Sequence, residues 1–134
     1  MFIVFAERGQ LKWISGIFRE AQQAKNYLEI IPEELKEYQR LVRLDHIEYP
    51  FYIIETKGFS YLSKIEVIEL LNSTSVSDDE DQVHFNIYRI DSDYRPKKPG
   101  TDYMGILRHD HVTNDFLRDY KKAGMAFLIN RRIM

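Results

Sequence analysis

Two histidines separated by one residue are the side chains whose types and spacing best fit chemistry in this chain. They occur in the string Arg108-His109-Asp110-His111. On an extended backbone alternate side chains share a face, so His109 and His111 are expected to point the same way. Two imidazoles on one face can bind a divalent metal. A third ligand would come from a carboxylate close in sequence, and three are candidates: Asp102, Asp110 and Asp115.

The histidine pair supports two interpretations. Because histidine titrates near neutrality, either ring can act as a general acid or base, and the pair with Asp115 predicts a small metal-dependent hydrolase. The other interpretation is a hydrogen-bonded pair that orders the start of the last helix. No nucleophile motif of the Gly-x-Ser-x-Gly type accompanies the pair, and the six glycines are too scattered for a phosphate-binding loop. No catalytic residue is therefore assigned from the sequence.

A second group combines tyrosines with charged residues around one predicted loop. Tyrosine and arginine are the residue types that most often anchor a protein partner. This composition predicts a non-enzymatic protein-binding module, such as an inhibitor, an immunity-type protein or an adaptor. The competing interpretation is a solvated loop whose tyrosines pack on the core. The predicted binding residues are Tyr88, Asp91, Asp93, Tyr94, Arg95, Tyr103 and Arg108.

Composition narrows the possible partners. The chain has 134 residues, 19 basic and 21 acidic side chains, a net charge of −2 and no cysteine. Without cysteine there is no disulfide and no sulfur-ligated zinc, and the composition indicates no cofactor. The lack of a basic excess argues against nucleic acid and anionic membranes as partners. Single-stranded nucleic-acid binding, with Tyr52 and Tyr88 stacking on bases, is therefore the least favoured function.

Length and the N-terminal pattern predict one domain over residues 1–134 and a cytoplasmic location. The N-terminus has no basic segment followed by a long apolar run, and no stretch approaches the roughly 20 apolar residues that span a bilayer. The composition favours another protein as partner and leaves the oligomeric state open.

The first 32 residues have the clearest element pattern. Phe2–Ala6 and Leu11–Ile17 are predicted strands around a tight turn at Glu7–Gln10, and a helix over Arg19–Ile31 is ended by Pro32. Since packing accounts for Trp13 and the helix stripe, this region is interpreted as scaffold. Any function is expected between Tyr88 and Asp115.

The remaining elements complete an α+β pattern. Ser63 and Glu66 fit a capping box, which favours a helix over residues 64–72 although a strand is the alternative; residues 104–112 fit either state. Thr113 or Asn114 is expected to cap a helix that ends at Gly124.

The fold class is α+β, with helices on a mostly antiparallel sheet of about five to six strands in ββα-ββα-β-α-β order. The other predicted strands are Tyr38–Leu44, Phe51–Thr56, Val83–Ile90 and Met125–Ile129.

Overall fold

The computed structural model describes residues 1–78, 82–102, 104 and 107–134. In these residues the fold is α+β with antiparallel pairing, as predicted. The predicted single sheet of five to six strands is wrong, because the strands divide into a three-stranded and a four-stranded sheet. The chain forms two compact units that are each discontinuous in sequence: unit 1 is Met1–Tyr49 with Asp91–Leu107, and unit 2 is Pro50–Ile90 with Arg108–Met134. Whether they behave as one domain stays a prediction.

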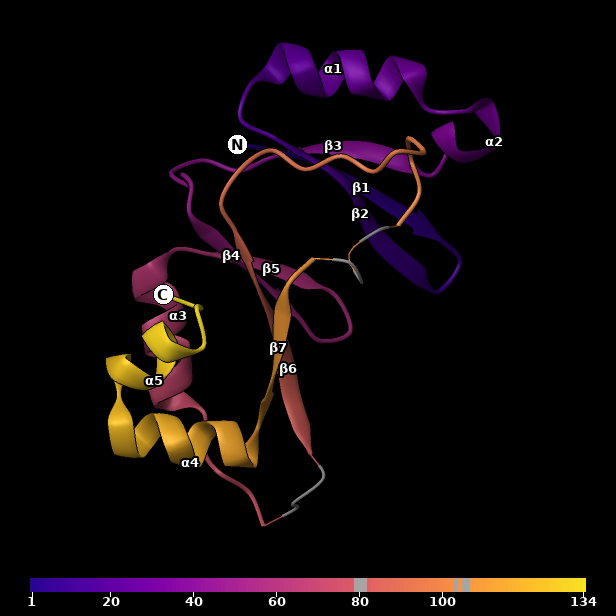
Figure 1. Cartoon of the computed structure of the whole chain (residues 1–134). Helices are drawn as coiled ribbons and strands as arrows, with labels where there is room; N and C mark the ends of the chain where they lie inside the picture. Colours follow the sequence, from indigo (N-terminus) through magenta and orange to yellow (C-terminus); the bar gives the residue numbers. More distant parts are fainter. Residues whose placement is uncertain (79–81, 103, 105–106) are drawn as a thin grey trace. The chain divides into compact units, whose positions relative to one another are not determined.

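Unit 1 is built on the predicted N-terminal hairpin (Figure 1). Strands β1 (Phe2–Arg8) and β2 (Leu11–Phe18) pair antiparallel, and Gly9 takes the positive φ of 61° that their tight turn needs. Strand β3 (Gln39–Arg43) adds to the other edge of β1. Helices α1 (Ala21–Ile30) and α2 (Glu33–Lys36) connect β2 to β3. Val4, Phe18, Ala24 and Tyr27 form the buried core between α1 and the sheet.

The segment from Asp91 onward returns to unit 1 and is attached to it by backbone hydrogen bonds. The N–H of Ile17 donates to the carbonyl of Tyr94 at 2.8 Å, and the N–H of Tyr94 donates to the carbonyl of Ile17 at 2.9 Å. These bonds place residues 91–102, the return segment, along the free side of β2. Figure 1 shows this segment in orange.

Gly100 anchors the return segment to the rest of unit 1 through three hydrogen bonds. Its N–H donates to the Tyr27 hydroxyl at 2.8 Å, and its carbonyl accepts from Trp13 Nε1 at 2.8 Å and from Gln39 Nε2 at 3.1 Å. Its φ of +87° suits glycine, and a Cβ there would lie 2.7 Å from the Ile31 side chain. Both the backbone angle and the space therefore require glycine.

Unit 2 places three helices on one face of the four-stranded sheet (Figure 1). The strands β4 (Phe51–Glu55), β5 (Phe59–Leu62), β6 (Val83–Ile90) and β7 (His109–Thr113) lie in the order β5-β4-β6-β7. The helices are α3 (Lys64–Ser73), α4 (Asn114–Ala123) and α5 (Met125–Asn130). The predicted order therefore lacked β5. Of the ambiguous range 104–112, residues 109–112 belong to strand β7, and residues 105 and 106 lie outside the described residues.

Side-chain caps start two of the helices of unit 2, α3 and α4. The Ser63 hydroxyl accepts from the Glu66 N–H while a Glu66 oxygen accepts from the Ser63 N–H, which confirms the capping box and the helix over α3. The Thr113 hydroxyl accepts from the Phe116 N–H and caps α4, which ends at Gly124 as predicted.

The predicted final strand at Met125–Ile129 is wrong, because this segment is helix α5. An apolar run this short fits a strand or a buried helical turn equally well by composition. The helix buries Leu128 completely and leaves Met125 and Ile129, one turn apart, 36% and 55% exposed. Phe127 and Leu128, which are consecutive in the sequence, both pack against the core of unit 2, whereas a strand would point them to opposite faces.

We expect Gly100→Ala to destabilise the protein by about 2–4 kcal/mol, since it combines a disfavoured positive φ with overpacking against Ile31. Urea unfolding measures the change. Gly58→Ala is the matched control, because its added Cβ would meet nothing within 4 Å and its φ is ordinary. An equal effect of the two substitutions would contradict the role assigned to Gly100.

Candidate functional site

A groove in unit 1 runs between α1 and the return segment, and we call it the α1 groove. It consists of two adjoining hollows of about 430 Å³ and 470 Å³ that share Gln23 and Asp93 in their lining. One hollow is also lined by Phe18, Asn26, Tyr27, Ile30 and Arg95, and the other by Arg19, Glu20, Tyr49, Asp91 and Ser92.

An arginine lies over a tyrosine ring in each half of the α1 groove. The guanidinium carbon of Arg95 is 5.3 Å from the centroid of the Tyr27 ring, and that of Arg19 is 5.2 Å from the Tyr49 ring. A cation over an aromatic face is attracted by the ring quadrupole, so each pair holds an arginine in place without neutralising it. The groove therefore presents two oriented guanidinium groups.

Asp93 lines both hollows of the groove and accepts two hydrogen bonds there. Its Oδ1 accepts from the backbone N–H of Arg19 at 3.0 Å and from the Tyr49 hydroxyl. Partial burial raises the pKa of Tyr49 first, and the hydrogen bond to the Asp93 carboxylate raises it further. Tyr49 is therefore a neutral donor near pH 7, and its ring is fixed beneath Arg19.

Tyr27 links the α1 groove to the interior of unit 1. Its hydroxyl donates to the Ser15 carbonyl at 2.6 Å and accepts from Gly100, while its ring packs 5.2 Å from the ring of Phe18. Burial raises the pKa of Tyr27, so the hydroxyl keeps the proton that it donates. The floor of the groove is thus fixed before any ligand arrives.

The two predicted histidines lie on the face of the unit 2 sheet opposite the helices. His109 and His111 share that face, with ring centroids 5.2 Å apart, as the alternation predicts. His109 also packs against Tyr88, its partner across β6 and β7, at 4.9 Å between ring centroids. The two imidazoles supply two neighbouring ligand positions, but the described residues contain no group of three His, Asp or Glu side chains that could hold a metal.

A hydrogen-bonded chain orients His111. Glu55 Oε1 accepts from the Tyr88 hydroxyl at 2.9 Å and from Asn86 Nδ2 at 3.1 Å. The oxygen of the Asn86 amide then faces His111 Nδ1, which must carry the proton for that contact. In the neutral ring Nε2 is therefore the acceptor, which is the form that a base or a metal ligand uses.

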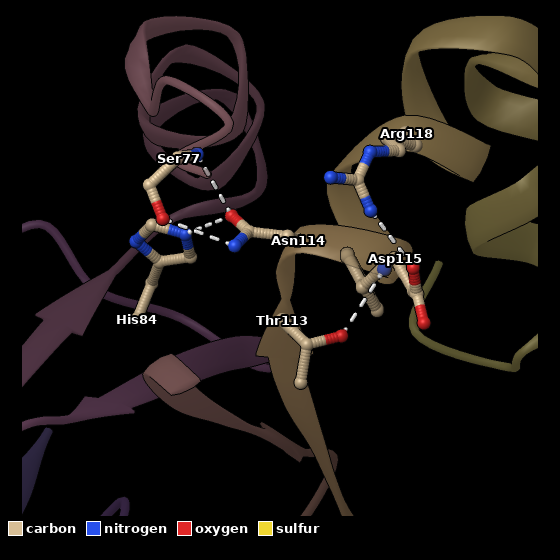
Figure 2. Close-up of polar contacts among 7 residues, drawn as sticks. Ser77, His84, Thr113, Asn114, Asp115 and Arg118 are labelled. Atoms are coloured by element: carbon tan, nitrogen blue, oxygen red, sulfur yellow. Dashed lines mark hydrogen bonds and ion pairs between the residues drawn. The ribbon is translucent and has the colours of Figure 1, made fainter. Parts of the chain in front are cut away.

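The structure separates the carboxylates suggested by the sequence from the histidine pair. Asp110 alternates to the other face of β7 and pairs with Arg131 at 2.7 Å. Asp115 lies in the first turn of α4, where it pairs with Arg118 at 2.9 Å (Figure 2). Asp102 lies in unit 1, where its Oδ1 accepts from the Met104 N–H.

Figure 2 also shows why Asn114 is buried at the start of α4. Its Oδ1 accepts from the Ser77 N–H at 3.0 Å and from His84 Nε2 at 2.8 Å, while its Nδ2 donates to the Ser77 hydroxyl at 3.0 Å. The amide thereby provides hydrogen-bond partners for Ser77 in the loop after α3 and for His84 in β6. We assign this cluster to structure, because the amide occupies the position between Ser77 and His84.

The predicted binding residues fall into several places. Asp91, Asp93 and Arg95 line the α1 groove, whereas Tyr94 pairs with β2 through its backbone. Tyr88 is buried in unit 2 beside His109, and Arg108 lies just before β7. Tyr103 lies outside the described residues.

Sequence reasoning missed the contribution of the first 32 residues to the α1 groove. Arg19, Gln23, Asn26 and Tyr27 lie on or next to a helix that the sequence assigned to scaffold. It also missed Glu55, because only the register of β4 and β6 brings it to Asn86. No local signal marks such long-range neighbours.

No known family model, curated protein or solved structure matches this chain. None of the helices in the described part of the chain is long and apolar enough to cross a membrane.

Tyr49→Phe should reduce the decrease in the free energy of unfolding at alkaline pH. The pKa of Tyr49 is higher in the folded protein than in the unfolded chain, so the unfolded chain loses this proton first as pH rises. The contribution of Tyr49 to the free energy of unfolding is therefore complete below about pH 10, the ordinary tyrosine value, and declines above it. We expect the wild type to lose up to about 1 kcal/mol more than the variant between about pH 9 and 11, after allowance for solvent screening. Urea unfolding at both pH values checks this, and parallel losses would contradict it.

Proposed function

We propose that this chain is a non-enzymatic protein-binding module whose α1 groove binds a short segment of another protein. The observation that carries the proposal is the pair of arginine–tyrosine stacks flanking Asp93. Tyrosine and arginine dominate binding energy at protein interfaces because they combine a large apolar area with directed hydrogen bonds.

The remaining lining of the groove fits a polypeptide. Gln23 and Asn26 are exposed amides on α1, able to bond both the carbonyl and the N–H of an extended peptide. Ile30 is 52% exposed at the same hollow and offers apolar contact to a side chain. The groove thus offers contacts for both the backbone and the side chains of a partner.

Charge favours protein over nucleic acid at this surface. Arg19 and Arg95 are balanced in the described lining by Glu20, Asp91 and Asp93. Carboxylates at this density repel a phosphate backbone, which needs clustered cations without acidic neighbours. A partner segment that presents both signs of charge would complement the surface.

The groove is also organised in advance of binding. Asp93 is fixed by the Arg19 N–H and the Tyr49 hydroxyl, and Tyr27 by its two backbone partners. Side chains that are already ordered lose less conformational entropy on association, so more of the contact energy remains for affinity.

We expect Arg95→Ala and Arg19→Ala each to weaken capture of a partner by about tenfold or more, the scale of an interface hot spot. The measurement is copurification with the tagged full chain from native cells, quantified for each polypeptide against the wild type. Circular dichroism and thermal unfolding establish that each variant is folded.

The matched control removes one exposed cation elsewhere, through Lys64→Ala at the start of α3 in unit 2. The proposal requires polypeptides that the wild type and this control capture equally and that both groove variants lose. Captured polypeptides that are indifferent to both groove substitutions would overturn it.

A further inference from the structure

Unit 2 contains a second concentration of arginine that the proposed function does not use. A small hollow of about 20 Å³ is lined by Arg89 on β6, Arg108 before β7, and Arg131 and Arg132 in the turn after α5. We call these four side chains the arginine cluster. The other residues at the hollow are Ile87, His109, Asp110 and Ile133.

The arginine cluster carries a local excess of positive charge. Among the described residues that line the hollow, Asp110 is the one carboxylate beside four guanidinium groups. Asp110 is directed to one of them, since its Oδ1 accepts from Arg131 Nη2 at 2.7 Å. A surface with such an excess of positive charge attracts anions.

Two arginines of the cluster, Arg131 and Arg108, are held by contacts within unit 2. Arg131 lies over the rings of Phe116 and Phe127, at 5.4 Å and 5.3 Å from their centroids. Arg108 Nη2 donates to the Arg131 carbonyl at 3.2 Å, which ties the start of β7 to the C-terminal turn. Two arginines of the cluster therefore have defined positions.

The C-terminal turn itself is also fixed. Arg132 adopts a positive φ of 59°, which is unusual for a residue other than glycine, and its N–H donates to the Ile129 carbonyl at 2.9 Å. The next residue, Ile133, is buried, and its carbonyl accepts from the Tyr52 hydroxyl at 2.7 Å. The turn thus presents two successive arginines from an anchored backbone.

We propose that the arginine cluster binds the terminal phosphate of a phosphate monoester or free phosphate. Four arginines that line one hollow suit a tetrahedral oxyanion, because a guanidinium group can donate two parallel hydrogen bonds to it. A hollow of about 20 Å³ admits little more than one oxygen, so the phosphate is held at the mouth and the group that it is esterified to stays outside. The site goes beyond the proposed function and does not depend on the α1 groove.

The test is a titration of the full ¹⁵N-labelled chain with inorganic phosphate, followed by amide NMR at constant ionic strength set with chloride. We expect saturable shifts of the Arg108 and Arg132 amides. Arg108→Ala with Arg132→Ala should raise the dissociation constant about tenfold or more. Arg108→Lys with Arg132→Lys, which preserves charge, should still weaken binding because lysine cannot donate in the bidentate geometry.

The matched control is Lys121→Ala with Lys122→Ala in the last turn of α4, which removes the same charge from unit 2. Its dissociation constant should stay within about twofold of the wild type. Equal weakening by the control and by the arginine variants, or shifts without saturation, would overturn the proposal.

Further titrations distinguish the source of the phosphate. A phosphoserine tetrapeptide that shifts the same amides, while its unphosphorylated form does not, supports a phosphorylated protein partner. Saturation by inorganic phosphate without competition from that peptide supports a free phosphate. Acetate binding at the same amides as tightly as phosphate would overturn the assignment, because a carboxylate would then suffice.

Discussion

The hydrogen bonds at Gly100 are the constraint on which the arrangement of unit 1 depends. The N–H and the carbonyl of Gly100 connect the return segment to α1 through Tyr27, to β2 through Trp13 and to the start of β3 through Gln39. Two of these bonds are buried and join residues that are 73 and 87 positions apart in the sequence. Without these partners the N–H and the carbonyl of Gly100 would be an unsatisfied donor and acceptor, so the three elements are coupled.

The same bonds explain why a groove exists beside α1. Asp93 and Arg95 line it from the return segment, and that segment lies against β2 because Tyr94 and Gly100 are bonded there. Tyr27 serves both parts, since its hydroxyl holds Gly100 and its ring lies beneath Arg95. The α1 groove is therefore an extension of the core of unit 1 and not a separate loop.

Much of the local structure was predictable from the sequence, because its causes are local. The Ser63–Glu66 box, the Thr113 cap and the hairpin turn at Gly9 each act within a few residues. The shared face of the two histidines also follows from strand periodicity alone. These features need no knowledge of the rest of the chain.

The features that the sequence did not predict depend on contacts between distant residues. The division into two sheets follows from β3 pairing with β1 while β4 pairs with β6, and local pattern does not choose between such partners. Glu55 meets Asn86 and Tyr88 through that same register. The sequence drew attention to the charged residues of the return segment, whereas the α1 wall of the groove resembled ordinary scaffold for this reason.

Native-state amide hydrogen exchange of the wild type and Tyr27→Phe measures the coupling at Gly100 most directly. Loss of this one hydroxyl should speed exchange at the amides of Gly100 and Tyr94, which bond to the Tyr27 hydroxyl and to β2. The amides of β6 in unit 2 should keep their wild-type rates. Unchanged exchange at Gly100 and Tyr94, or a uniform increase across both units, would contradict the role given to the Gly100 hydrogen bonds.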